Sequence, residues 1–264
     1  MKSFKNNLVA PIPLAERDQH FCVNELVLNQ MVKAAHLTKK DIILEIGAGT
    51  GNLTSKLAEK AKKVIAIEND SRFQPVLLQS QGNVEVIIGN ALKILPQRKD
   101  FNKIVASIPY QICEPLMHYL CTAQHLKLAV LLVPKKFALN LLKHLLFSAF
   151  LQVTLVTEVA KESFNPPPKV QSEIILIKLR QKVDDDLFIR QKLYRQRHKK
   201  VKNGLRDAII DLYWNKHQQR LSKKEALIIV DSFKLAPELL ATSIARMHPK
   251  WYEIIGDKVK SRKD

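Results

Sequence analysis

Short apolar runs alternate with amphipathic stretches along roughly the first 150 residues. The apolar runs cover residues 42–46, 63–67, 84–88, 104–106 and 126–133, and helical patterns follow at 52–61 and 135–147. Strands that are covered on both faces read as continuous apolar runs, and strands that alternate with helices build a parallel sheet with helices on both faces. We therefore expect a mostly parallel α/β sheet between about residues 23 and 147.

Two more apolar runs, 151–159 and 173–179, flank a proline-rich segment and predict a terminal hairpin that closes one edge of the sheet. After an acidic linker at 184–186 the pattern turns helical, most clearly at 223–231 and 237–245. The expected organisation is a flexible basic arm over residues 1–16, an α/β domain over 17–181 and a small C-terminal helical domain over 187–264. Pro11 and Pro13 interrupt the apolar stretch of the arm, so we do not expect a signal peptide.

The first apolar run breaks into a glycine-rich turn. Gly47, Gly49 and Gly51 follow Glu45 and precede a helical stretch, an arrangement that brings backbone next to a ligand. A dinucleotide fingerprint has glycines at its first, third and sixth positions, and here the sixth position is Asn52. This spacing favours a ligand that lacks phosphates and carries an amino acid and a sulfonium, as S-adenosylmethionine does. A tight turn without a ligand and a nicotinamide site are the alternatives.

The next two strands also lead into polar residues. The run 63–67 ends at Glu68, where a bound ribose needs an acceptor for its hydroxyl groups. The run 84–88 is followed by Gly89, Asn90 and Ala91, so we assign Asn90 and Ala91 to the same ligand edge, with the Asn90 amide oxygen accepting from an adenine amine. Asparagine after glycine is also a common turn residue, which is the alternative for Asn90.

A fourth strand ends in Ser107, Ile108, Pro109 and Tyr110. An acceptor side chain, a backbone carbonyl, a proline and an aromatic ring suit a flat purine held by its exocyclic amine. The lone pair of that amine is delocalised into the ring, so catalysis depends on geometry and electrostatics. We expect the Ser107 hydroxyl and the Ile108 carbonyl to accept the amine hydrogens, Pro109 to fix the backbone, and Tyr110 to stack on a flipped-out base.

Taken in order, these motifs resemble the small-subunit rRNA adenine N6-dimethyltransferases, the KsgA family, which is related to the macrolide-resistance rRNA methyltransferases. The resemblance extends to residues 19–23 (Gln-His-Phe-Cys-Val), to residues 164–172 (Phe-Asn-Pro-Pro-Pro-Lys-Val-Gln-Ser) and to the basic residues 195–205. It implies a Rossmann-like, S-adenosylmethionine-dependent methyltransferase domain with a small C-terminal helical domain. It also implies that Gln19, His20 and Cys22 fold over the methionine end of the cofactor, and that Phe164 stacks on the base opposite Tyr110.

Two positions depart from the family pattern, whose members usually carry Asp at position 90 and Asn at position 107. Asn90 keeps an acceptor and removes a charge, so cofactor binding should at most weaken. Ser107 bears on the chemistry, because its side chain is shorter than that of asparagine. Losing or lengthening one such hydrogen bond costs about 1–3 kcal/mol, roughly 5- to 150-fold in rate. We hypothesise that a water fills the gap between Ser107 and the base.

The chain has 43 basic and 25 acidic residues and a formal net charge of +18, which points to a polyanionic partner. The densest basic stretch lies in the C-terminal third and contains no acidic residue between positions 190 and 202. A solvated helix face is the alternative for such a run. The candidate RNA-binding residues are Arg195, Arg197, Lys199, Lys200 and Lys202.

Cysteines, histidines and long apolar runs add few constraints. Three cysteines without Cys-x-x-Cys spacing suggest neither a disulfide framework nor a zinc site, and no paired histidine spacing suggests a metal site. No apolar run reaches the roughly 18 residues of a membrane span. We expect a cytoplasmic monomer without metal or membrane attachment, and small-subunit rRNA or the assembling subunit as its partner.

Three functions remain open on the sequence. The favoured one is a methyltransferase that, by resemblance, dimethylates two adjacent adenosines in the hairpin loop near the 3′ end of small-subunit rRNA during subunit assembly. The second is a weakly active or noncatalytic assembly factor that binds pre-small-subunit rRNA with the same fold. The third is an adenine methyltransferase acting on DNA or on another RNA, against which the resemblance of the C-terminal basic segment argues.

Overall fold

A computed structural model of the chain describes residues 11–14, 19–80, 82–181 and 183–232. Contacts divide the chain into two compact units. The first contains the residues up to Leu142 together with Leu151–Leu179, and the second contains Lys143–Phe150 together with the residues from Arg180 onward. Most of the expected N-terminal arm and all of the expected helix at 237–245 lie outside the described residues.

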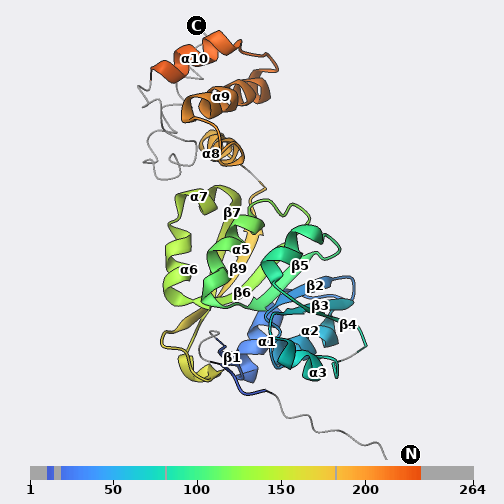
Figure 1. Cartoon of the computed structure of the whole chain (residues 1–264). Helices are drawn as coiled ribbons and strands as arrows, with labels where there is room; N and C mark the ends of the chain where they lie inside the picture. Colours follow the sequence, from blue (N-terminus) through green and yellow to red (C-terminus); the bar gives the residue numbers. More distant parts are fainter. Residues whose placement is uncertain (1–10, 15–18, 81, 182, 233–264) are drawn as a thin grey trace, which may run out of the picture. The chain divides into compact units, whose positions relative to one another are not determined.

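A seven-stranded sheet forms the centre of the first unit, in the order β4-β3-β2-β5-β6-β9-β7 (Figure 1). Neighbouring strands from β4 to β6 are parallel, whereas β9 runs antiparallel to both β6 and β7. The expected mostly parallel sheet with a terminal hairpin is therefore confirmed. The strands are β2 (Ile42–Ile46), β3 (Lys63–Glu68), β4 (Val84–Ile88), β5 (Lys103–Ser107), β6 (Leu128–Pro134), β7 (Leu151–Val159) and β9 (Ser172–Leu179).

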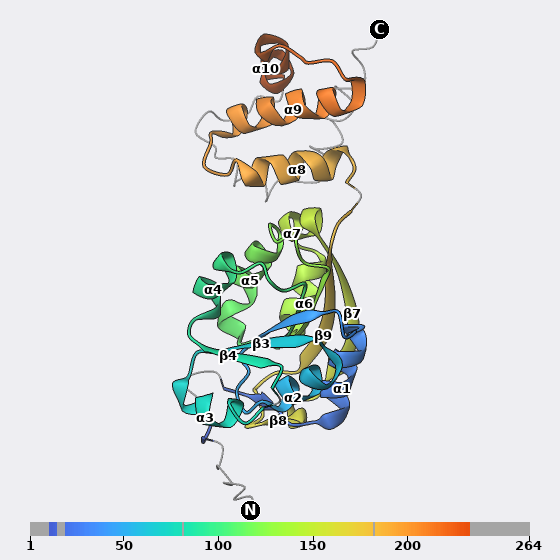
Figure 2. The same ribbon diagram turned by 90° about the vertical axis from the view of Figure 1, so that its right-hand side faces the viewer.

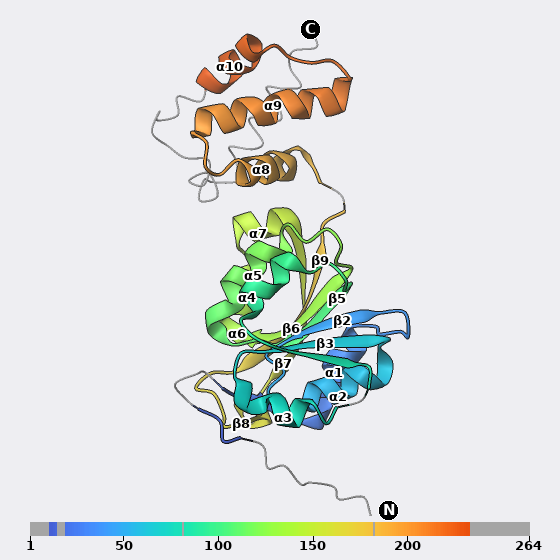
Figure 3. The ribbon, with the colours of Figure 1, turned by 45° about the vertical axis from the view of Figure 1, so that its right-hand side comes forward.

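Helices cover both faces of this sheet, which is why every residue of β6 is buried (Figure 3). On one face lie α1 (Glu25–Ala34) and α2 (Asn52–Lys60), and on the other lie α4 (Ala91–Ile94), α5 (Cys113–Leu120) and α6 (Lys135–Leu142). The short α3 (Gln74–Leu77) packs near β4. Single 3₁₀ turns occur at Ser71–Phe73, Leu95–Gln97, Tyr110–Ile112 and Lys161–Ser163.

Two segments far apart in the sequence pair as a second, two-stranded sheet of β1 (Phe21–Cys22) and β8 (Phe164–Asn165). The Val23 N–H donates to the Ser163 carbonyl at 2.8 Å, and His20 Nδ1 donates to the Pro166 carbonyl at 2.9 Å. Strands of two residues leave no periodic signal in a sequence, so this sheet was not expected. It brings the residues 19–22 against the proline-rich segment between β7 and β9.

The prediction of a single helix over residues 135–147 is wrong. α6 ends at Leu142, and a new helix, α7 (Leu145–Phe150), begins after His144 and belongs to the second unit. The ring Nδ1 of His144 accepts the N–H of Phe147 at 3.3 Å, so its side chain satisfies one of the backbone donors that a helix start leaves open. Only two polar residues, Lys143 and His144, separate the apolar residues on either side of the break, which is too short a gap for the pattern to reveal it.

The second unit is helical, with α7, α8 (Asp185–Arg195), α9 (Val201–His217) and α10 (Lys223–Asp231) (Figure 2). The expected helix at 223–231 is confirmed, and a capping box of Ser222 and Glu225 starts it. The acidic residues 184–186, expected as a linker, instead begin α8. Asp184 accepts the N–H of Leu187 at 2.8 Å, and Asp185 and Asp186 stand in the first turn, where negative charge favours a helix.

Candidate active site

A cavity of about 550 Å³ lies in the first unit where β2, β3, β4 and β5 reach their carboxyl ends. Ligands of open α/β sheets bind at this edge. With two exceptions, Gly49 and Gly51, every residue that the sequence assigned to catalysis or cofactor binding lines this cavity. Those lining residues are Gln19, His20, Cys22, Glu45, Gly47, Glu68, Asn90, Ala91, Ser107, Ile108, Pro109, Tyr110 and Phe164.

The glycine turn needs glycine at each of its three positions, because Gly47, Gly49 and Gly51 all have positive φ angles, of 71°, 51° and 81°. A Cβ on Gly47 would lie 3.6 Å from the Ser107 carbonyl oxygen and 3.8 Å from Pro109 Cδ, so the turn packs directly against the segment 107–110. A Cβ on Gly49 would collide with the ring of Phe21. Gly49 and Gly51 thus shape the turn without lining the cavity.

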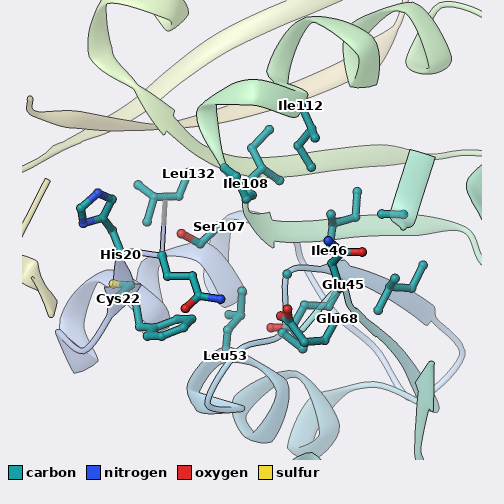
Figure 4. Close-up of a pocket in the computed structure, with 18 of the residues that line it drawn as sticks. His20, Cys22, Glu45, Ile46, Leu53, Glu68, Ser107, Ile108, Ile112 and Leu132 are labelled. Carbon is teal, nitrogen blue, oxygen red and sulfur yellow. The ribbon is translucent and has the colours of Figure 1, made fainter. Parts of the chain in front are cut away.

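Two carboxylates stand beside this turn (Figure 4). Glu68 accepts the N–H groups of Gly49 and Asp70, each at 2.8 Å, which fixes its carboxylate at the end of β3. Glu45 is buried and accepts the Thr54 hydroxyl at 2.6 Å. Burial raises the pKa of Glu45 to about 8; the Thr54 hydrogen bond opposes this shift, and the nearby Glu68 adds to it.

The charge of the cavity wall is one-sided. The carboxyl groups of Glu45, Glu68 and Asp70 line it, although Glu45, with a pKa of about 8, is protonated near neutral pH in the ligand-free protein and Asp70 is paired with Arg72. No lysine or arginine is found among the described lining residues. A wall with carboxylates and no cationic side chain suits a ligand that carries positive charge and opposes one that carries phosphates. The geometry therefore fits a sulfonium and an ammonium group better than a dinucleotide.

The segment 19–22 runs along one wall of the cavity and is tied to three parts of the unit. Gln19 Nε2 donates to Asp70 Oδ2 at 3.0 Å, and the Cys22 carbonyl accepts from Asn52 Nδ2 at 3.2 Å. Together with the bond from His20 to the Pro166 carbonyl, these contacts connect β1 to the ends of β3, α2 and β8. The Cys22 thiol is buried, and burial raises its pKa.

The four residues 107–110 follow β5 directly. The N–H of Ile108 donates to the Leu132 carbonyl at 3.2 Å, which continues the pairing of β5 with β6 and holds the segment in place. No described residue forms a hydrogen bond with the Ser107 hydroxyl, and in Figure 4 this hydroxyl points toward Leu132 and away from Glu45 and Glu68. Pro109 then starts the 3₁₀ turn that contains Tyr110.

Asn90 lies at the predicted edge, but its side chain has a local partner. Its Oδ1 accepts the N–H of Leu92 at 2.9 Å and so caps the first turn of α4. This is the role of a turn and capping residue. Any contact of Asn90 with a ligand uses the second lone pair of the same oxygen or the amide nitrogen.

The cavity also contains residues that the sequence did not single out. Asp70 accepts from Arg72 as well as from Gln19, and the Arg72 hydrogen bonds hold the pKa of Asp70 well below its usual range. Asn52 and Pro168 line the wall, as does Ser172 at the start of β9. In the sequence, Asn52 served only to show that the glycine motif differs from a dinucleotide fingerprint. The position of Ser172 depends on strand pairing that no local sequence pattern reveals.

The candidate RNA residues in the second unit fall into two groups. Lys199 pairs with Asp207 at 3.0 Å, and Lys202 pairs with Asp231 at 2.6 Å. By contrast, Arg195 and Lys200 are exposed and form no ion pair with any described residue, and Arg197 lies over the Tyr194 ring at 5.1 Å from its centroid. The cationic surface at the turn from α8 to α9 is therefore carried mainly by Arg195, Arg197 and Lys200.

The sequence profile of the ribosomal RNA adenine dimethylase family matches residues 16–238. The chain belongs to this family. It is 36% identical over 207 residues to a probable ribosomal RNA small subunit methyltransferase A of Methanosarcina barkeri, covering 71% of each chain. The identification as a member of the small-subunit rRNA adenine dimethyltransferases is thereby confirmed.

Solved structures agree with this membership of the ribosomal RNA adenine dimethylase family. A dimethyladenosine transferase from Plasmodium falciparum aligns with a TM-score of 0.60 and 27% identity, over 92% of this chain and 98% of that chain. The 23S rRNA methyltransferase ErmE aligns with a TM-score of 0.57 over 91% and 99% of the two chains, and at 18% identity this likeness shows the fold alone. The Rossmann-like methyltransferase fold is confirmed.

Neither a metal site nor a membrane span is found among the described residues. No group of three or more His, Cys, Asp or Glu side chains there could hold a metal ion. Within the same residues, the helices are too short or too polar to span a bilayer.

Proposed function

We propose that this chain is an S-adenosylmethionine-dependent rRNA adenine N6-methyltransferase that dimethylates two adjacent adenosines in the hairpin loop near the 3′ end of small-subunit rRNA. It acts in the cytoplasm as a monomer during subunit assembly. The observation that carries the proposal is the contact of the glycine turn with residues 107–110 in one cavity, in a chain of the adenine dimethylase family.

The donor half of the cavity fits S-adenosylmethionine, which supplies an electrophilic methyl group when bound. Glu68 would accept from the ribose hydroxyls, and the wall of the glycine turn admits backbone contact with the methionine part. Glu68 and the absence of lysine and arginine from the described wall favour a ligand with positive charge, and such a ligand would in turn favour the ionised form of Glu45. Gln19, His20, Cys22, Asn90 and Ala91 would complete the donor site.

The acceptor half would hold the adenine. The Ser107 hydroxyl and the Ile108 carbonyl accept the two hydrogens of the exocyclic amine, which directs its lone pair toward the donor half. Tyr110 and Phe164 stack on the two faces of the flipped-out ring, and Pro109 keeps the backbone of the segment fixed. None of these residues needs to remove a proton before the methyl transfer, because the nitrogen attacks with its lone pair.

The second unit would supply affinity for RNA. Arg195, Arg197 and Lys200 present positive charge to solvent, and phosphate neutralisation dominates binding to nucleic acids. Lys199 and Lys202 would contribute less, since each already neutralises an aspartate.

The decisive experiment uses small-subunit rRNA from cells with and without the gene, with mass spectrometry of mono- and dimethyladenosine at the loop. We expect dimethyladenosine in the first and unmodified adenosine in the second. The purified chain with labelled S-adenosylmethionine should restore the modification in subunits from the deletion strain, and a Glu68→Ala variant serves as the donor-site control. Dimethyladenosine that persists without the gene would rule the proposal out. Subunits that bind the chain and stay unmethylated would instead support a noncatalytic assembly factor.

A further inference from the structure

Ser172 is a buried polar residue of the cavity for which the proposed mechanism has no use. It is the first residue of β9, is 3% exposed and lines the same cavity as Ser107, Tyr110 and Phe164. Among the described residues its hydroxyl has no hydrogen-bond partner. The hydroxyl oxygen is not shut off from the cavity, so a ligand atom held there can bond to it.

The position of Ser172 in the sheet indicates which ligand it faces. Ser107 ends β5 and is opposite Leu132 on β6, and Ser172 is opposite Pro134 on β6 from the other side. The glycine turn and Glu68 follow β2 and β3, which lie beyond β5 in the opposite direction. Ser172 therefore belongs to the acceptor half of the cavity, and residues 107–110 lie between it and the donor half.

The chemistry of adenine indicates what Ser172 would do there. Once Ser107 and the Ile108 carbonyl accept the amine hydrogens, the remaining polar atoms of the base that can form hydrogen bonds are the ring nitrogens N1, N3 and N7, and each of them accepts. On the β6 and β9 side of the cavity, the described lining residues Leu132, Phe164 and Pro168 have no side-chain donor, and His20 uses its Nδ1 donor for the Pro166 carbonyl. A hydroxyl can donate one hydrogen bond, and Ser172 supplies one at this wall.

A nearby serine provides a contrast. Ser163 is also buried, but it is used by the fold: its hydroxyl accepts from Asn24 Nδ2 at 3.1 Å, and its carbonyl accepts the N–H of Val23. Ser163 stabilises the pairing near β1 and β8, whereas no such contact explains Ser172.

We propose that Ser172 is a positioning residue that donates a hydrogen bond to a ring nitrogen of the target adenine. This inference rests on the proposed function and adds a specific contact to it. Removing one such bond should lower kcat/KM for RNA by roughly 5- to 50-fold in Ser172→Ala. The affinity for S-adenosylmethionine, measured by calorimetry, should stay unchanged.

The test combines the variant with changed substrates. Wild type and Ser172→Ala are assayed on RNA that carries adenosine, 1-deaza-, 3-deaza- or 7-deazaadenosine at the target position. If Ser172 donates to one of these nitrogens, the analogue that lacks that nitrogen should be methylated more slowly than adenosine by the wild type. Ser172→Ala should methylate that analogue and adenosine at the same rate. Ser163→Ala is the matched control, and it should lower stability while keeping the wild-type response to every analogue.

Two outcomes would overturn the inference. One is that every deaza analogue lowers the rate of the wild type and of Ser172→Ala by the same factor, since the hydroxyl would then contact no ring nitrogen. The other is a loss of S-adenosylmethionine affinity as large as the loss of kcat/KM. Wild-type activity on unmodified RNA tests the proposed function separately, so failure of the Ser172 contact leaves that function standing.

Discussion

At the scale of single residues, position 107 sets the geometry of the reacting amine. A serine places its acceptor on a shorter side chain than the asparagine usual in the family, and its hydroxyl is open to the cavity. We expect Ser107→Asn to raise kcat by roughly 5- to 150-fold, because a direct acceptor would replace a water-mediated one. Methyl incorporation into the same RNA by both proteins measures this. An unchanged or lower rate for the asparagine variant would refute the hypothesis of a bridging water.

A second residue-scale prediction concerns Glu45. Its pKa is raised from 4.5 to about 8, mainly by burial, so folding favours the protonated form. That stability is fully present below the unfolded pKa and is lost as the pH rises through about 8, with a slope of at most about 1.4 kcal/mol per pH unit. Glu45→Gln keeps an acceptor for Thr54 and should remove this slope.

Urea unfolding of wild type and Glu45→Gln from about pH 5 to about pH 8 measures the difference. The ligand-free proteins must be compared, because a bound cation would favour the charged carboxylate. Parallel curves for the two proteins would show that Glu45 ionises without cost to the fold.

At the scale of elements, the strongest constraint is the contact between the glycine turn and β1. Gly49→Ala would force a Cβ into the Phe21 ring at a positive φ angle, and we expect it to lower the free energy of unfolding by about 1–3 kcal/mol. Gly82→Ala is the control, because a Cβ on Gly82 meets nothing within 4 Å. Chemical unfolding of both variants tests this. Equal stability of the two would mean that Phe21 moves aside freely.

The elements also show what a sequence can and cannot predict. The strands β2 to β5 and the helix α10 were predicted within a residue or two, because each has a strong apolar run or a clear capping signal. The pairing of β1 with β8 was missed, since its stability comes from partners such as His20 and Pro166, which are 146 positions apart. The end of α6 was missed because only Lys143 and His144 separate the apolar residues of the two helices, and the side-chain cap at His144 has no signature in the apolar pattern.

The residues of the candidate site also fall into those that the sequence could predict and those that it could not. Residues on the strand ends could be assigned from order alone, because the carboxyl ends of parallel strands share one edge. Asp70 and Ser172 could not, since one depends on a side-chain network with Gln19 and Arg72 and the other on the register of an antiparallel strand. The one-sided charge of the cavity likewise follows only from knowing which residues line it.

At the scale of the whole molecule, the net charge of +18 does not give the number of cations that can bind RNA, because some basic side chains are already paired with aspartates. Replacing Arg195 and Lys200 with alanine should weaken RNA binding and reduce the slope of log K against log salt by roughly 2. The control is the double variant Lys60→Ala and Lys62→Ala, which removes the same amount of charge. Both lysines are exposed and lie at the C-terminal end of α2, whereas the glycine turn precedes its N-terminal end. Binding curves over a range of salt concentrations measure both slopes, and equal slopes would make the α8 to α9 turn a merely solvated surface.

The pairing of β1 with β8 has a consequence for synthesis on the ribosome. Phe21 leaves the exit tunnel long before its partner Asn165 exists, so the nascent chain carries an incomplete cavity while most of the sheet is already being made. Contacts of such long range also slow folding in general. A truncated or stalled chain that ends before β8 should therefore be unable to retain the methyl donor, which would confine activity to polypeptides whose translation has passed the proline-rich segment.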